Sequence, residues 1–147
     1  MIIAETKNFI LESHPRPEIS RTDGGHLVIN PKIAVKDRTE LSVELAKEMA
    51  SLSHIAGRSM KSGLAKRGIE LGRINYQDNG NWRQDLHLHL YGRAIDAIYQ
   101  TYGEPVRAAR KPEDKIDQEK LNTDDCEAIR SELLKFTKEE QYKGLIT

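Results

Sequence analysis

Polar and apolar residues alternate without a break in the stretch Asp85-Leu86-His87-Leu88-His89-Leu90-Tyr91-Gly92-Arg93. Successive side chains of a β-strand point to opposite faces, so this alternation predicts a half-buried strand whose leucines face a core. The polar row on the other face would hold Asp85, His87, His89 and Tyr91. Two histidines held about 7 Å apart on a strand suit metal ligation, acid/base chemistry or nucleophilic attack by an imidazole.

The size and charge of the chain limit what it can be. Its 147 residues suit one domain with a sizeable core. Lys and Arg together number 23, as do Asp and Glu, and this balance argues against a general nucleic-acid or membrane-surface binder. The single cysteine, Cys126, excludes an internal disulfide. No segment reaches the roughly 18 apolar residues of a membrane span, so we expect a cytoplasmic protein with no nucleic-acid or membrane partner.

Hydrophobic patterns and turn signals place strands on both sides of one long helix. Strands are expected at residues 1–5, 8–12, 26–30, 72–77 and 85–93. Apolar residues recur at steps of three or four from Leu41 to Leu64 and predict an amphipathic helix. Asp37 is expected to cap the start of this helix and Gly68 to end it. Because strands and helices do not alternate, the pattern favours an α+β fold with an antiparallel sheet.

The last third of the chain has a different character. Residues 103–120 are charged, contain two prolines and are expected to form an exposed connection. Asn122 is then expected to open a final helix with a narrow apolar stripe. We therefore divide the chain into a domain at residues 1–100 and a polar connection with a C-terminal helix at residues 101–147.

Residues 85–93 resemble the signature strand of the histidine triad (HIT) proteins. In that family three histidines alternate with apolar residues, and an arginine often follows four positions after the third. Counting back from Arg93 makes His89 the third triad position, His87 the middle one and Asp85 the first, so an aspartate stands where the family has a histidine. A competing register makes His87 the first position, His89 the middle one and Tyr91 the third.

Other segments resemble the same family in the right order. Residues 24–32 are similar to its Gly-His, apolar run and Pro-Lys segment, with His26 as the histidine. Glu18 and Ile19 match the positions where the family places an acidic residue on the ribose hydroxyls and an apolar residue against the base. Asn75 matches an asparagine that lies near the reacting phosphate. The resemblance thus implies a nucleotide-binding set of Glu18, Ile19, His26, Asn75 and Arg93, beside the catalytic set His87, His89 and Asp85.

The resemblance also implies an architecture and partners. It predicts a five-stranded antiparallel sheet with one long helix packed on it, and a homodimer that pairs through this helix and an edge strand. The partner of the site would be a nucleotide substrate. No cofactor or protein-bound metal is expected, and a divalent cation, if one takes part, would arrive with the substrate.

The chemistry can also be argued from the residues. A neutral imidazole is a good nucleophile toward phosphorus near neutral pH. Attack by His87 on a nucleoside α-phosphate would give a nucleotidyl-histidine intermediate that water then hydrolyses, while His89 donates to a phosphoryl oxygen or the leaving group. Together with the histidine triad resemblance, this chemistry implies a nucleotide phosphohydrolase or nucleotidyl transferase that acts on a nucleoside phosphoramidate or a dinucleoside polyphosphate.

Three alternatives remain open at this stage. The carboxylate of Asp85 would repel an anionic substrate unless it is paired, or it would accept from an imidazole N–H and fix the useful tautomer. Asp85, His87 and His89, joined by His26, would also suit a zinc or iron site. Finally, the chain would be a nucleotide-binding protein with little catalysis if Asp85 has weakened the site.

Overall fold

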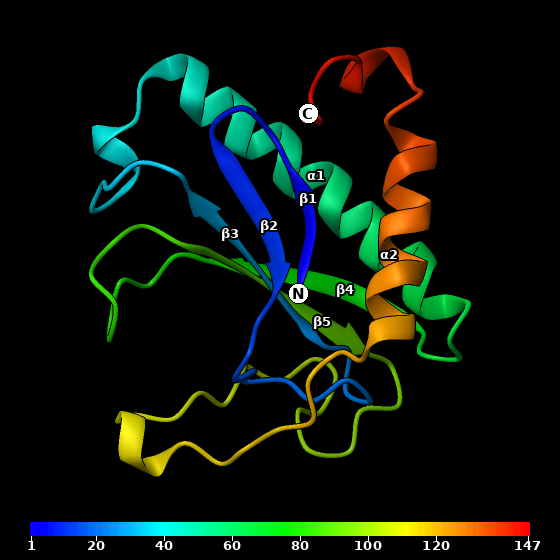
Figure 1. Cartoon of the computed structure of the whole chain (residues 1–147). Helices are drawn as coiled ribbons and strands as arrows, with labels where there is room; N and C mark the ends of the chain where they lie inside the picture. Colours follow the sequence, from blue (N-terminus) through cyan, green and yellow to red (C-terminus); the bar gives the residue numbers. More distant parts are fainter.

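A single antiparallel sheet forms the centre of the computed structural model, which describes residues 1–147. The sheet order is β1-β2-β3-β5-β4, and all neighbouring strands run antiparallel (Figure 1). The strands are β1 (Ile2–Glu5), β2 (Phe9–Ser13), β3 (His26–Pro31), β4 (Leu71–Gln77) and β5 (Leu88–Ala94). This sheet with two helices confirms the predicted α+β fold class.

The strand β5 lies between β3 and β4, and all seven of its residues are buried. Its leucines enter the apolar core, whereas His89 and Tyr91 face the other way, as the alternation predicts. The strand begins at Leu88, not at Asp85, because the first ladder partner of β3 is Leu88 opposite Ile29. The first positions of the predicted strand therefore belong to the end of the β4–β5 loop.

The helix α1 (Val43–Ala65) covers the leucine face of the sheet with Met49, Leu52 and Met60 among its buried residues. Its cap is Ser42, whose hydroxyl accepts from the backbone N–H of Leu45. The prediction that Asp37 caps the long helix is wrong. Asp37 caps the separate 3-10 turn η1 (Arg38–Glu40), and Leu41 then takes an extended conformation that ends this turn before α1 starts.

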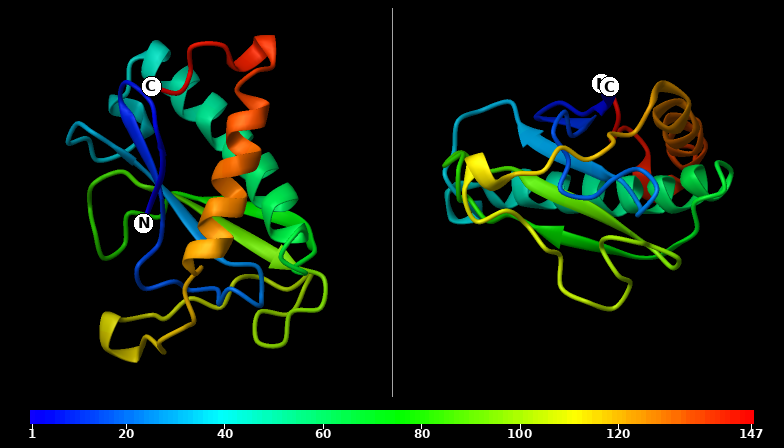
Figure 2. Two further views of the ribbon diagram at one scale, coloured as in Figure 1. Left: turned by 45° about the vertical axis from the view of Figure 1, so that its right-hand side comes forward. Right: turned by 90° about the horizontal axis from the view of Figure 1, so that it is seen from below.

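The helix α2 (Thr123–Phe136) packs against α1 (Figure 2). The contact is close because Gly63 has no side chain: a Cβ there would lie 2.7 Å from backbone atoms of Ile129. As predicted, Asn122 opens this helix, in a capping box with Asp125. Ile129 and Leu133 belong to the same apolar core as α1 and the sheet. Neither helix is long and apolar enough to cross a membrane.

Between β5 and α2 the chain runs from residue 95 to 122 with one 3-10 turn, η2 (Pro112–Asp114), drawn in yellow in Figure 1. Most of its side chains are exposed, as predicted. Lys115 differs, because its side chain is only 6% exposed and lies against the loop that follows β2. This segment therefore forms part of a wall beside the sheet.

Candidate functional site

A cavity of about 250 Å³ opens on the sheet face opposite α1. Its floor comes from side chains that stand next to one another on β3 and β5, where Val28 pairs with His89 and His26 with Tyr91. The walls come from the loop after β2, the β4–β5 loop and the segment after β5. The cavity brings together four of the predicted site residues: Glu18, His26, His87 and His89.

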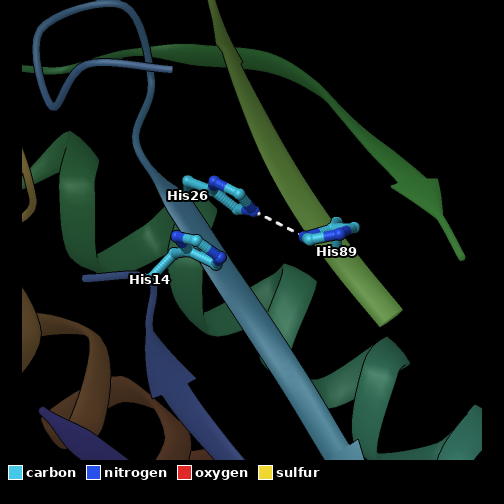
Figure 3. A group of neighbouring side chains, drawn as sticks. All are labelled: His14, His26 and His89. Atoms are coloured by element: carbon cyan, nitrogen blue, oxygen red, sulfur yellow. Dashed lines mark hydrogen bonds between the residues drawn. The ribbon is translucent and has the colours of Figure 1, made fainter. Parts of the chain in front are cut away.

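Nε2 of His26 lies 2.8 Å from Nδ1 of His89 across the floor of the cavity (Figure 3). Nδ1 of His26 accepts from the backbone N–H of Glu18 at 3.1 Å. A neutral imidazole carries one proton, so His26 holds it on Nε2 and donates it to Nδ1 of His89. His89 in turn keeps its own proton on Nε2.

A third histidine, His14, completes this cluster and was not predicted. Its ring stacks on that of His26 with centroids 4.3 Å apart and the planes nearly parallel (Figure 3). Its Nδ1 accepts from the backbone N–H of Arg16 at 3.2 Å. His14 reaches this place because its own backbone N–H bonds the carbonyl of His26 and extends the β2–β3 pairing by one residue. The sequence pattern does not reveal this pairing, because a long loop separates His14 from its partner His26.

Burial keeps the three clustered histidines neutral. Desolvation lowers the pKa of His14 to about 4 and that of His89 to about 3, and it holds the pKa of His26 well below 6.5. Repulsion from Lys115 and from His87 adds a smaller lowering of the pKa of each of the three rings. At neutral pH the cluster therefore offers lone pairs and N–H donors, and no positive charge.

The nitrogens of His14, His26 and His89 lie within 4.8 Å of one another, close enough to be tested as a metal site. This set differs from the predicted candidate of Asp85, His87 and His89 with His26. A metal-bound imidazole normally donates its outer N–H to a carbonyl or carboxylate. Here the outer nitrogens of His14 and His26 accept from backbone N–H groups instead. The arrangement is thus that of a hydrogen-bonded cluster.

His87 is held by the loop that leads into β5. Its Nδ1 lies 2.7 Å from the backbone carbonyl oxygen of Asp85, which can only accept, so Nδ1 carries the proton and Nε2 carries the lone pair. Burial lowers the pKa of His87, which keeps this lone pair available at neutral pH. The ring stands edge-on to that of His89, with centroids 4.5 Å apart. An imidazole with a free lone pair, His87, and an imidazole with a free N–H, His89, therefore lie side by side in one cavity.

No family model and no curated protein matches the sequence of this chain. Its structure is similar to solved structures of histidine triad proteins. A zinc-bound histidine triad family protein from Mycobacterium smegmatis is 22% identical, with a TM-score of 0.60, and the match covers 92% of this chain and 86% of that one. A histidine triad (HIT) protein from Sinorhizobium meliloti 1021 is 15% identical, with a TM-score of 0.66, and the match covers 92% and 87%.

A third similar structure is a hypothetical histidine triad nucleotide-binding protein from Sulfolobus tokodaii strain7. It is 14% identical, with a TM-score of 0.64, and the match covers 97% of this chain and 89% of that one. The chain has the histidine triad fold. Because the identities are low, the likeness establishes the fold, and the chemistry of the site is argued from the residues of this chain.

The first position of the triad signature lies outside the cavity of this histidine triad fold. Asp85 is exposed, and its side chain does not line the cavity. Its carbonyl oxygen accepts from Nδ1 of His87, and its carboxylate acts on His87 only as a minor Coulombic influence that raises the pKa of the ring. The prediction that the carboxylate faces the histidines therefore does not fit the structure, because β5 starts only at Leu88 and the chain turns before it.

Three further residues picked out by the histidine triad resemblance also lie away from the cavity. Ile19 is fully buried. The guanidinium of Arg93 donates to Oδ1 of Asn75 at 2.8 Å and to the carbonyls of Thr101 and Glu104 at 2.9 and 2.8 Å. Arg93 and Asn75 line a separate pocket of about 380 Å³. Their contacts hold the turn after β5 in place, and this turn leads into the segment that forms one wall of the cavity.

Lys115 is the second site residue that the sequence did not reveal. Its ammonium lies 2.7 Å from the carboxylate of Glu18 and also donates to the carbonyl of Arg16. The side chains of Lys115 and Glu18 are 6% and 13% exposed. Nothing in the polar pattern of residues 103–120 distinguishes Lys115 from its exposed neighbours, because its contact is long-range in sequence.

Proposed function

We propose that the protein belongs to the histidine triad family and is a nucleotide phosphohydrolase or nucleotidyl transferase that uses His87 as a covalent nucleophile. Its substrate would be a nucleoside phosphoramidate or a dinucleoside polyphosphate. The observation that carries this proposal is the 2.7 Å contact of Nδ1 of His87 with the carbonyl of Asp85. This contact fixes the tautomer whose Nε2 can attack phosphorus.

The proposed reaction has two displacements at the same phosphorus. Nε2 of His87 attacks the α-phosphate and forms a P–N bond as the bond to the leaving group breaks. The imidazole then carries positive charge, and the carbonyl of Asp85 stabilises it through the Nδ1 proton. Water attacks the nucleotidyl-histidine in the second displacement, which releases a nucleoside monophosphate and frees His87.

His89 would act as the hydrogen-bond donor to the reacting phosphate. The chain of bonds from Glu18 through His26 to Nδ1 of His89 leaves the proton of His89 on Nε2. Because burial lowers the pKa of His89 to about 3, the ring donates this bond as a neutral group. It therefore favours an oxygen on which negative charge builds up, without adding a permanent charge.

Charged groups at the cavity wall suit a nucleotide. Arg83 lines the cavity, and its guanidinium is held by Oδ1 of Asn30 at 2.5 Å. It would neutralise phosphate charge beside His87. Glu18 would accept from the ribose hydroxyls, and Lys115 shares this carboxylate and keeps it in place. No step of this route requires a metal held by the protein.

The decisive experiment incubates the protein in EDTA with adenosine and guanosine phosphoramidates and dinucleoside polyphosphates. Mass spectrometry of the acid-labile adduct then locates the nucleotidyl group. We expect turnover and an adduct on His87 that His87→Ala abolishes, while His54→Ala, a histidine on α1 bonded to Tyr142, behaves as wild type. An adduct on His89 would favour the competing register. Nucleotide binding without turnover would make the chain a binding protein.

We also propose that the protein forms a homodimer, as the resemblance suggests. The strand β4 is at the edge of the sheet and has one side without a partner strand. The helix α2 covers part of α1 near Gly63, which leaves β4 and the remaining face of α1 for a two-fold contact. Light scattering after size-exclusion chromatography tests this, and a monomer mass at micromolar concentrations would contradict it.

A further inference from the structure

We propose that Trp82, on the β4–β5 loop, is the platform on which the base of a purine nucleotide stacks. This inference rests on the proposed function, since it assigns the base subsite of the same cavity. A nucleobase needs a flat apolar surface that solvent can reach, next to the group that holds the ribose. Trp82 meets both conditions.

The first argument is the accessible aromatic surface of the cavity. Ile19, the residue expected to contact the base, is fully buried and does not line the cavity. Tyr91 is 2% exposed, and His14 has one face covered by His26. Trp82 lines the cavity and is 45% exposed, so it is the most exposed aromatic side chain there.

The second argument is the position of Trp82 relative to the proposed ribose site. The ammonium of Lys115 lies 5.7 Å from the centroid of the Trp82 ring and 2.7 Å from the carboxylate of Glu18. The indole and the carboxylate therefore both lie close to the same ammonium. Two neighbouring subsites of this kind suit a nucleoside, whose base and ribose are joined directly.

The third argument is the room around the indole. The segment after β5 contributes only the small side chains of Ala108 and Ala109 to the wall of the cavity, and the loop after β2 contributes Pro15. These residues bring no further aromatic ring into the cavity, and the group that lies over the indole is the ammonium of Lys115, 5.7 Å from its centroid. A purine has a larger stacking area than a pyrimidine, so we expect purine nucleotides to bind more tightly.

The chain contains one tryptophan, so its fluorescence reports on this site alone. Wild-type protein is titrated with AMP, CMP and ribose 5-phosphate, and calorimetry gives the affinities for wild type, Trp82→Phe and Trp82→Leu. We expect AMP to quench the fluorescence and to bind Trp82→Leu about 5- to 150-fold more weakly, the range that base stacking on an aromatic ring usually supplies. Trp82→Phe should keep most of the affinity, and ribose 5-phosphate should bind all three proteins alike.

Two results would overturn the inference in different ways. If AMP binds wild type and Trp82→Leu equally and without quenching, the nucleotide site stands and the role of Trp82 is wrong. If neither AMP nor ribose 5-phosphate binds the wild-type protein, the proposed function fails and the inference fails with it. Circular dichroism controls the fold, and both variants are expected to fold because Trp82 lies on an exposed loop.

Discussion

Nε2 of His26 lies 2.8 Å from Nδ1 of His89, and the backbone N–H of Glu18 occupies the other nitrogen of His26. This pair connects the loop that holds the proposed ribose carboxylate with the proposed donor on β5. A neutral imidazole has one proton for its two nitrogens, so a donor bonded to one nitrogen fixes the proton on the other. The position of the Glu18 backbone thus decides which nitrogen of His89 carries its proton.

Replacing His26 tests this coupling. His26→Leu removes the donor to His89, and we expect kcat to fall roughly 10²-fold because the donor is no longer oriented. His26→Gln places an amide N–H near the former Nε2, so it should recover much of kcat. Steady-state kinetics on both variants measure this, with KM expected to change less than kcat. Equal losses in the two variants would indicate that His26 matters only for packing.

The rate should depend on pH through His87. Burial lowers the pKa of this histidine below 6.5, and only its neutral form can attack phosphorus. The rate therefore rises as the pH increases through this lowered pKa and is constant around neutral pH. A profile of kcat/KM from pH 4 to 8 checks this, and an acid limb centred at or above pH 6.5 would contradict the assignment.

Stability should fall in mild acid because of the histidine cluster. The pKa of His14 is about 4 in the folded protein and 6.5 when the chain is unfolded, so between these values the unfolded state binds more protons. Lowering the pH from 7 to 4.5 therefore favours unfolding. His14→Phe cannot take up this proton, so urea denaturation should show a smaller loss of stability over the same range than in wild type. If the wild type and His14→Phe lose the same stability between pH 7 and 4.5, His14 is solvated like a surface histidine.

The sequence predicts the parts of this site that depend on local pattern. The alternation in residues 85–93 predicts that His89 faces away from the core, and the resemblance singles out Glu18 and His26; all three line the same cavity. His14 and Lys115 were missed because each enters the site through a partner far along the chain. Pairings of this kind are set by the register of β2 on β3 and by the path of residues 95–122, which periodicity does not encode.

The starts of α1 and β5 show a second limit of predicting structure from local sequence pattern. The sequence predicts Asp37 as the cap of the long helix because Glu40 follows it at capping-box spacing. The structure uses Asp37 to cap η1 and Ser42 to cap α1. Asp85 was placed in β5 by alternation, but a strand extends only as far as its neighbours offer hydrogen-bond partners. The side chain of Asp85 therefore lies outside the cavity.

The ion pair between Lys115 and Glu18 should stabilise the fold. Lys115→Met leaves a nearly buried carboxylate without its cation, and we expect a loss of about 1–3 kcal/mol in the free energy of unfolding. Lys115→Met combined with Glu18→Gln should recover part of this loss because no uncompensated charge remains. Urea denaturation of the wild type, both single variants and the double variant gives the coupling energy. Additive losses would show that the two groups do not interact.

The close contact of α1 with α2 gives a prediction on stability alone. A Cβ at Gly63 would lie 2.7 Å from the backbone of Ile129, so Gly63→Ala forces the two helices apart. We expect a loss of about 1–3 kcal/mol in the free energy of unfolding, despite the better helix propensity of alanine. Lys61→Ala, at an exposed position of the same helix, is the control and should change stability by less than about 0.5 kcal/mol. A stabilised Gly63→Ala would mean that α2 moves freely on α1.

Activity should survive the removal of metal ions. For a metal to bind His14, His26 and His89, the protons on Nε2 of His14 and His26 would have to move to Nδ1, where the N–H groups of Arg16 and Glu18 already point. Both amides would then lose their acceptors, and each loss of this kind costs about 1–3 kcal/mol. We therefore expect dialysis against EDTA to leave kcat unchanged and metal analysis to find less than one zinc per chain. Stoichiometric zinc that His14→Phe removes, together with activity that zinc restores after EDTA, would overturn this prediction and establish the three histidines as ligands.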